Sequence, residues 1–292
     1  MPKKRAKDSD KSLEKDPEIP AEATTISTAI EERQVEERVA IGAHVVYETI
    51  RREGDDELSR PISALAWSGI AAGLSMGSSF IAEALLQAYL PDRPWRPLIS
   101  RFGYSLGFLI VVLGRQQLFT ENTLTVILPF LLHTELKVFL KVMRLWGVVL
   151  LSNLIGTYLF ALCIAHIHVF SPPVEAALTA IGAAHLGTSF GIVFIRAIFA
   201  GWLIATMVWL LPGAEQSRVS IIIILTYLIG LGNFNHVIAG STTVFYMVAS
   251  GAASWATYFT SFFLPTFLGN ILGGVSLVAA LAHAQVTGGK PK

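Results

Sequence analysis

Gly230-Leu231-Gly232-Asn233-Phe234-Asn235-His236-Val237-Ile238-Ala239-Gly240-Ser241 interrupts the apolar segment 219–249 and leaves a short apolar run on each side. Each run is too short to cross a bilayer comfortably, because a spanning helix needs about 20 apolar residues. The backbone groups freed by such a break must be satisfied by neighbouring protein or in a lined cavity. The break also places His236 at membrane depth, where an ionisable side chain is a candidate for function. The stretch is therefore the first candidate for a transport path.

The composition is that of a polytopic membrane protein with a polar N-terminal segment. Of the 292 residues, 53% are hydrophobic and 15% are charged, and the mean hydropathy is +0.57. These values do not fit a soluble domain of this size. The segment before Pro61 contains 15 of the 21 acidic residues and 11 of the 22 basic ones. We expect four parts: a disordered cytoplasmic tail over 1–27, an amphipathic cytoplasmic helix and linker over 28–60, a membrane body over 61–285 and a cytoplasmic tail over 286–292.

The N-terminal helix is expected to run from Thr28 to Arg52, because apolar residues there fall mostly on one side of a helix. Gly54-Asp55-Asp56 is expected to end it. The single cysteine, Cys163, excludes a disulfide within one chain.

Six apolar segments are long enough to cross a bilayer. They cover 62–90, 100–133, 142–167, 190–211, 219–249 and 258–283, with a short amphipathic piece at 174–184. The second is interrupted at 114–122 and the fifth at the opening stretch. Six crossings place both termini on one side of the membrane, and the distribution of lysine and arginine favours the cytoplasm.

The two halves of the membrane body resemble each other. Ser152-Asn153-Leu154-Ile155-Gly156-Thr157 in the third span and Gly269-Asn270-Ile271-Leu272-Gly273-Gly274 in the sixth share a small-Asn-apolar-apolar-Gly-small pattern. The breaks contain Leu118-Phe119-Thr120 and Asn233-Phe234-Asn235, and matching the two phenylalanines gives similar spacings of 34 and 36 residues to the asparagines. Three spans in each half predict an all-α body built as a 3+3 inverted repeat.

Paired broken helices in an inverted repeat indicate a substrate site near the midplane. Each break exposes a helix N-terminus, which favours an anion. Asn153 and Asn270 are expected to hold the breaks by hydrogen bonds or to serve as packing contacts between helices.

Several short motifs follow one another through the membrane body. They are Leu118-Phe119-Thr120, Trp146 with Asn153-Leu154-Ile155-Gly156, Phe194-Ile195-Arg196-Ala197-Ile198 with Trp209, and Phe234-Asn235-His236 with Ile238-Ala239. In their order and spacing they resemble the formate/nitrite transporter family, and the resemblance covers about 61–283. It implies an aquaporin-like fold, a homopentamer with one path per protomer, and small monovalent anions such as formate, nitrite or hydrosulfide as substrates.

The resemblance also implies residue roles. His236 matches the central histidine of the family and Thr120 its loop threonine. Leu118, Phe119 and Phe234 match the apolar constrictions on either side. Imidazole suits a role in which His236 donates a hydrogen bond or a proton to the anion midway; the alternative is that it only satisfies backbone carbonyls of the break.

Three positions depart from the family pattern. Asn235 stands where a glutamate usually precedes the histidine, Gly201 where the fourth span usually has an asparagine, and His185 near the place of a vestibule lysine. These departures indicate a divergent, YfdC-like branch and leave the usual substrates open.

Other charged residues have two interpretations each. Glu121 and Arg115 flank the first break. They are either functional residues or an ion pair that fixes the loop. Arg196 attracts anions in a vestibule or extends to the interface. His166 and His168 could ligate a metal, but no third ligand is near them in sequence, and an interfacial position is the better interpretation.

Functions of other classes stay open. A facilitator of small neutral solutes is one, although the Asn-Pro-Ala pair of aquaporins is absent. A membrane-embedded enzyme is a second alternative, although the sequence contains no recognisable catalytic constellation. A scaffold or sensor that binds a partner through the N-terminal helix is a third. No motif indicates a cofactor or a nucleic-acid partner, so the expected partners are the lipid bilayer, the small anion or weak acid, and further copies of the chain.

Overall fold

The computed structural model describes residues 41–288, apart from the side chains of Leu277 and Thr287. The tail expected over 1–27, the helix expected over 28–40 and the end of the C-terminal tail lie outside the described residues. Within 41–288 every regular element is a helix. Five helical segments there are long and apolar enough to cross a membrane: Ile62–Tyr89, Arg96–Leu113, Leu136–Ile167, Phe190–Gly213 and Trp255–Val286.

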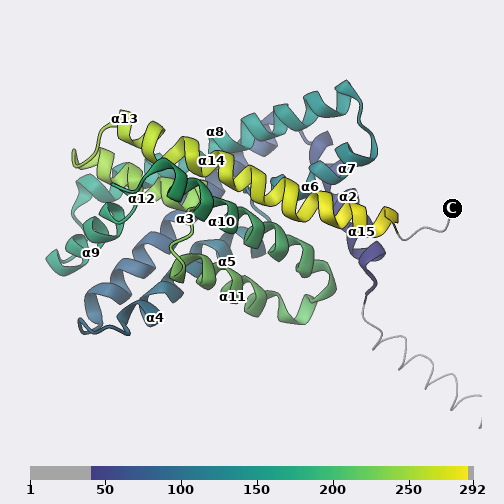
Figure 1. Ribbon diagram of the computed structural model, residues 1–292. Helices are drawn as coiled ribbons and strands as arrows, with labels where there is room; N and C mark the ends of the chain where they lie inside the picture. The colour runs from purple at the N-terminus through teal and green to yellow at the C-terminus, as the bar shows by residue number, and fades with distance from the viewer. Residues whose placement is uncertain (1–40, 289–292) are drawn as a thin grey trace, which may run out of the picture. The chain divides into compact units, whose positions relative to one another are not determined.

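The helices follow one another with short connections (Figure 1). In the first half the elements are α2 (Ala43–Ser59), α3 (Ile62–Tyr89), α4 (Arg96–Ser100), η1 (Arg101–Tyr104), α5 (Ser105–Leu113), α6 (Asn122–Thr125), α7 (Ile127–Leu132) and α8 (Leu136–Ile167). In the second half they are α9 (Pro172–Ala183), α10 (Phe190–Leu210), η2 (Leu211–Gly213), η3 (Glu215–Ser217), α11 (Arg218–Leu231), α12 (Val237–Ala249), α13 (Trp255–Thr257), η4 (Tyr258–Phe263), α14 (Leu264–Ile271), η5 (Leu272–Ala279) and α15 (Ala280–Gly288).

Both predicted interruptions are present, and the second is shorter than expected. The first separates α5 from α6, and the second comprises only residues 232–236, between α11 and α12. Residues 230 and 231 still belong to α11, and 237–241 already belong to α12. The helices flanking the second break have 14 and 13 residues. Neither reaches the length of about 20 residues that a bilayer crossing needs.

Two predicted helix ends are wrong. The N-terminal helix does not break at Gly54, because α2 continues to Ser59. Gly54 is buried, and a Cβ there would meet the backbone carbonyl of Thr125, so the glycine permits close packing rather than a turn. At the other end the last helix passes the predicted end of the sixth span at 283, because α15 continues to Gly288.

The exposed face of α2 is charged. Arg51 forms ion pairs with Glu48 and Asp55, and Arg52 also pairs with Glu48. Hydrogen bonds from the guanidinium groups of Arg51 and Arg52 lower the pKa of Glu48 to about 2. The opposite face contributes Ile50 and Leu58 to the core. The predicted amphipathic pattern is therefore present in the described part of this helix.

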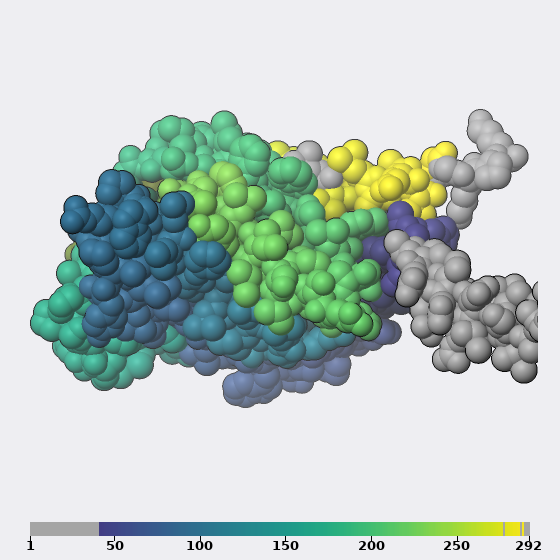
Figure 2. All heavy atoms as spheres, turned by 90° about the horizontal axis from the view of Figure 1, so that it is seen from below, coloured from purple at the N-terminus to yellow at the C-terminus, as the bar shows by residue number. Residues whose placement is uncertain are grey.

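The helix α11 packs against the segment that leads into α5. Tyr227 donates a hydrogen bond to the carbonyl oxygen of Leu98 over 2.8 Å, and its ring stacks on Phe102 with centroids 4.2 Å apart. In Figure 2 the light green spheres of α11 lie beside the blue segment. The helix α11 also contacts α5, and these are the two helices that end at the two breaks.

Candidate functional site

One asparagine holds the first break from the inside of the protein. The side chain of Asn153, on α8, is fully buried. Its Oδ1 accepts a hydrogen bond of 2.9 Å from the backbone N–H of Phe119. Its Nδ2 donates to the carbonyl oxygens of Gly69 and Gln117, both over 2.8 Å. A single carboxamide thus satisfies backbone groups of the break and of α3, which would be costly to leave unpaired when buried.

Asn270, on α14, makes the same three bonds in the second half. Its Oδ1 accepts from the backbone N–H of Val237 over 2.8 Å. Its Nδ2 donates to the carbonyl oxygens of Ala197 and Asn235, also over 2.8 Å. Both asparagines therefore hold the breaks by hydrogen bonds, as one of the two sequence interpretations expected.

The matching bonds correct the register that the sequence suggested. Phe119 and Val237 both donate their N–H to an asparagine, so Val237, not Phe234, has the same hydrogen-bonding position as Phe119. In this register His236 corresponds to Leu118. The two phenylalanines resemble each other in sequence, but the backbone groups that the carboxamides bind decide the equivalence.

The two breaks meet at a hydrogen bond between His236 and Thr120. His236 Nε2 and Thr120 Oγ1 are 2.7 Å apart, and the two residues are 1% and 0% exposed. The other ring nitrogen, Nδ1, accepts a hydrogen bond of 3.1 Å from the backbone N–H of Ala239 and caps α12. A nitrogen that accepts carries no proton, so the ring is neutral with its proton on Nε2, and Nε2–H donates to Thr120.

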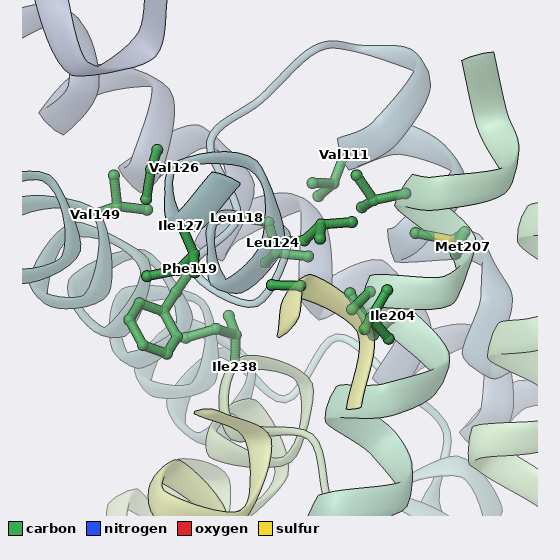
Figure 3. Close-up of a cluster of buried hydrophobic side chains, with 14 of the residues drawn as sticks. Val111, Leu118, Phe119, Leu124, Val126, Ile127, Val149, Ile204, Met207 and Ile238 are labelled. Carbon is green, nitrogen blue, oxygen red and sulfur yellow. The ribbon is translucent and has the colours of Figure 1, made fainter. Parts of the chain in front are cut away.

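Apolar side chains surround this polar pair. The ring of Phe108, on α5, meets the His236 ring edge-on with centroids 5.1 Å apart. Leu118 and Phe119 are both fully buried. Figure 3 shows them with Leu124 and Ile238 in one cluster of apolar side chains. No sequence pattern indicates Phe108 as part of the site, because its approach to His236 depends on how α5 packs.

A large polar cavity lies on the side of α2. Its volume is about 560 Å³, and we call it the α2-side cavity. Its lining residues are Glu53, Asp56, Glu57, Arg60, Val112, Leu113, Arg115, Gln116, Gln117, Leu118, Glu121, Asn122, Thr125, Val208, Leu211, Pro212 and Arg218. Leu118 is the predicted constriction residue that faces it.

Two small cavities lie near the other end of α11. Each has a volume of about 20 Å³, and both are lined by His185 and Asn233; we call them the His185 cavities. Arg218 at the start of α11 lines the α2-side cavity, whereas Gly230 near its end lines a His185 cavity. At 1.5 Å per helical residue, about 18 Å separates them. Thr120 and His236 belong to the two breaks, which lie between the α2-side cavity and the His185 cavities.

The predicted vestibule residues come together in the His185 cavities. His185, Arg196 and Asn235 line the same one, and Phe234 lines its neighbour. His185 Nδ1 lies 3.1 Å from the carbonyl oxygen of Ile181. Phe119 lines none of these cavities; its ring packs against Trp146 and Phe267.

An ion pair that was not predicted from the sequence lines one of the His185 cavities. Arg101 forms an ion pair with Glu83, whose side chain is 3% exposed, and donates a hydrogen bond of 2.8 Å to Asn233 Oδ1. Asn233 has a φ of +48°, a conformation in which asparagine is among the better tolerated residues. The pair links α3 and η1 to the second break. In the sequence, the only indication of this ion pair is the charged residue Glu83 within an apolar span.

The ion pair considered between Arg115 and Glu121 is wrong. Arg115 Nη1 lies 3.3 Å from Glu53 Oε1 on α2, and both side chains are exposed. Glu121 Oε1 is buried without a hydrogen-bond partner. Both residues line the α2-side cavity, and they do not neutralise each other there by direct contact.

His168 likewise has a partner other than a metal: its Nδ1 lies 3.2 Å from Glu175 Oε1. Among residues 41–288 no group of three or more metal-ligating side chains comes together.

Gly201 lies at a helix crossing and lines none of the cavities described above. It is buried on α10, where a Cβ would lie 2.7 Å from Asn270 Cα and 2.8 Å from its carbonyl carbon. The missing side chain therefore permits α10 to approach the helix that holds the second break.

Gly201→Ala is expected to destabilise the protein by about 1–3 kcal/mol through overpacking. The control is Gly147→Ala on α8, where a Cβ meets nothing within 4 Å; it should be neutral or stabilise by up to about 1 kcal/mol. Thermal unfolding in detergent measures both. Equal melting temperatures for the two variants would contradict the close approach at Gly201.

Comparison with known proteins places this geometry in a family. The family model for formate/nitrite transporter proteins matches residues 44–284. The chain belongs to the formate/nitrite transporter family. It is therefore an integral membrane protein of a transporter family and not of an enzyme family.

Individual relatives agree with this assignment. The chain is 39% identical to the inner membrane protein YfdC of Escherichia coli (strain K12) over 251 residues, which cover 86% of this chain and 81% of YfdC. It is 26% identical to the uncharacterized transporter YrhG of Bacillus subtilis (strain 168) over 215 residues, covering 70% and 79%.

Two solved structures of formate/nitrite transporter channels share the fold. A pentameric formate channel with formate bound superposes with a TM-score of 0.65 at 20% identity, covering 81% of this chain and 99% of the channel. A second ion channel of the family gives a TM-score of 0.72 at 18% identity, covering 83% and 98%.

Proposed function

We propose that this protein is a transmembrane channel or transporter for small monovalent anions or their weak acids, of the formate, nitrite and hydrosulfide class. The observation that carries the proposal is the buried hydrogen bond between Thr120 and His236. It joins the two breaks between a polar cavity on one side and two small cavities on the other. Family membership and a related channel with formate bound support the substrate class.

The membrane body is proposed to be a 3+3 inverted repeat of six spans, with the second and fifth broken. The identical hydrogen bonding of Asn153 and Asn270 supports this architecture. In it, residues 96–132 form the broken second span and residues 218–249 the broken fifth, and α12 directs its N-terminus at the centre. Unpaired N–H groups and the helix dipole at such an end favour a negatively charged group.

Passage past the centre is proposed to require the neutral acid. An unpaired charge is expensive to move into an apolar environment, and the side chains around the central pair are apolar. Leu118 and Phe234 line the two ends of this region, and Phe119 supports it through its packing.

His236 acts in this scheme as a hydrogen-bond donor. Its single ring proton on Nε2, which now donates to Thr120, can donate to an oxygen or sulfur atom of the permeating species. Thr120 offers its hydroxyl from the facing break. His185 and Arg196 attract anions into the vestibule on their side, where Asn235 adds a neutral polar group in place of an acid.

The assembly and placement are proposed from relatives and from charge. The solved relative is a pentamer and YfdC is an inner membrane protein, so we infer a homopentamer in a bacterial inner membrane. The excess of lysine and arginine on the side of the termini favours cytoplasmic ends. Residues 1–27 form the proposed cytoplasmic tail and 28–60 the cytoplasmic helix and linker, followed by the transporter body.

Uptake of weak acids into proteoliposomes tests the function. Formate and nitrite should enter at initial rates that fall as the external pH rises and the neutral acid becomes scarce, while empty liposomes show only the slow background. Glycerol, a small neutral solute without an acidic proton, should not enter faster than in empty liposomes. Absence of flux for every small anion tested, at every pH, would reject the transporter.

A further inference from the structure

The α2-side cavity contains unpartnered polar atoms. Within the part of the chain that the structure describes, four buried side-chain nitrogen or oxygen atoms lack a hydrogen-bond partner. Three of them, Gln116 Oε1, Glu121 Oε1 and Arg218 Nε, belong to residues that line this cavity. Buried polar groups are normally paired, so such a concentration points to a group that the cavity takes up.

Glu121 is the acid closest to the central pair along the chain. It follows Thr120 directly, at the start of α6, and its carboxyl group forms no hydrogen bond or ion pair among residues 41–288. Its φ and ψ of −66° and −39° are helical, so the backbone there is unstrained. A carboxyl group that is neither paired nor used as a helix cap is free to exchange a proton.

The transported anion needs a proton that His236 does not supply. In the neutral ring Nδ1 accepts from Ala239, and only Nε2 carries a hydrogen. Loss of that hydrogen would leave an imidazolate anion in an apolar site, which is costly. His236 therefore donates a hydrogen bond and keeps its proton, and the proton that neutralises the anion must come from elsewhere.

The charged groups around Glu121 come from three elements. Glu53, Asp56 and Glu57 line the cavity from α2 and Arg60 from the residue that follows this helix, while Arg115 comes from the first break and Arg218 from the start of α11. Arg115 is paired with Glu53 and Arg60 with Glu57. Arg218 is the cation that none of these acids neutralises by direct contact. It can hold an arriving anion in the cavity while Glu121 exchanges the proton.

We propose that Glu121 is the proton donor and acceptor of the α2-side cavity for the permeating weak acid. This inference rests on the proposed function. In the step, the O–H bond of the protonated Glu121 breaks and a new bond forms between that proton and the anion, which leaves a glutamate carboxylate and the neutral acid. The neutral acid moves on to His236, and hydronium from the cavity water returns a proton to Glu121. Transport in the other direction reverses the step.

Initial uptake from the side of the α2-side cavity tests the proposal with formate as the probe. Glu121→Gln should lower the rate at neutral external pH about tenfold or more, because a positioned acid or base contributes at least this much to proton transfer. On acidification the variant should approach the wild type, since the free acid then needs no donor. Glu121→Asp, which keeps a carboxyl group, should retain the wild-type pH profile.

Glu175→Gln is the matched control, since it removes an acid outside these cavities; its rate and pH profile should stay those of the wild type. Superposable pH profiles of Glu121→Gln and the wild type would overturn the role of Glu121 and leave the proposed function intact. Failure of the wild type to carry any weak acid would instead reject both.

Infrared difference spectra between acidic and neutral pH give a second measurement that needs no transport. They should contain the carbonyl band of a protonated carboxyl group that shifts in Glu121→Asp. This comparison does not depend on the folding of the glutamine variant. Absence of a band that responds to Glu121→Asp would overturn the proposal.

Discussion

His236→Ala is expected to lower weak-acid uptake about 10- to 100-fold. Without the imidazole, a polar group of the permeating acid is left unsatisfied in a buried site, which costs about 1–3 kcal/mol, and each 1.36 kcal/mol of barrier corresponds to a tenfold change in rate. Here the polar group belongs to the permeating acid at the buried Thr120–His236 pair, beside the ring of Phe108. Initial uptake of formate and nitrite into proteoliposomes measures the effect.

The alanine variant also loses the cap of α12, because His236 Nδ1 accepts from Ala239. His236→Asn separates the two roles. Asparagine is a good N-cap residue, so this variant should keep the thermal stability of the protein and still lose transport, since its carboxamide has a shorter reach than Nε2. Full uptake by a folded His236→Asn variant would show that the histidine serves only the backbone of the break.

The sequence predicted the number and place of the breaks because two physical signals mark them. Glycine and polar residues interrupt apolar runs at 114–122 and 230–241, and an asparagine follows each break in a later span. The residues Asn153, Asn270, Thr120 and His236 were found in this way, and the structure joins Thr120 to His236.

What the sequence could not predict depends on contacts between distant elements. The proposed register of the two halves follows from which backbone N–H each asparagine binds. The sequence suggests a wrong register because Phe119 and Phe234 are the same residue type, although Asn270 binds the N–H of Val237 and not that of Phe234. The partner of Arg115 is Glu53, which lies 62 positions away on a helix that was expected to end at Gly54. Nothing local in the sequence records such a contact.

Asn270→Ala is expected to destabilise the protein by about 3–5 kcal/mol. The substitution leaves two buried backbone groups without a partner, the N–H of Val237 and the carbonyl oxygen of Asn235, and it also removes the second hydrogen bond to the carbonyl oxygen of Ala197 inside α10. Each buried group left unpaired costs about 1–3 kcal/mol, and water from the small cavities offsets part of the sum. For a chain of this size the loss corresponds to a decrease of about 6–20 °C in melting temperature.

Thr266→Val is the matched control for Asn270→Ala, because both residues lie fully buried on α14. Thr266 Oγ1 has no hydrogen-bond partner, so valine of nearly the same shape should leave the stability unchanged or raise it slightly. Thermal unfolding of the three proteins in detergent gives the comparison. Asn153→Ala should lose as much as Asn270→Ala, since it frees the N–H of Phe119 and the carbonyl oxygen of Gln117 and removes the second hydrogen bond to the carbonyl oxygen of Gly69. A melting temperature of Asn270→Ala close to that of Thr266→Val would mean that packing, and not the three hydrogen bonds, holds the second break and therefore positions His236.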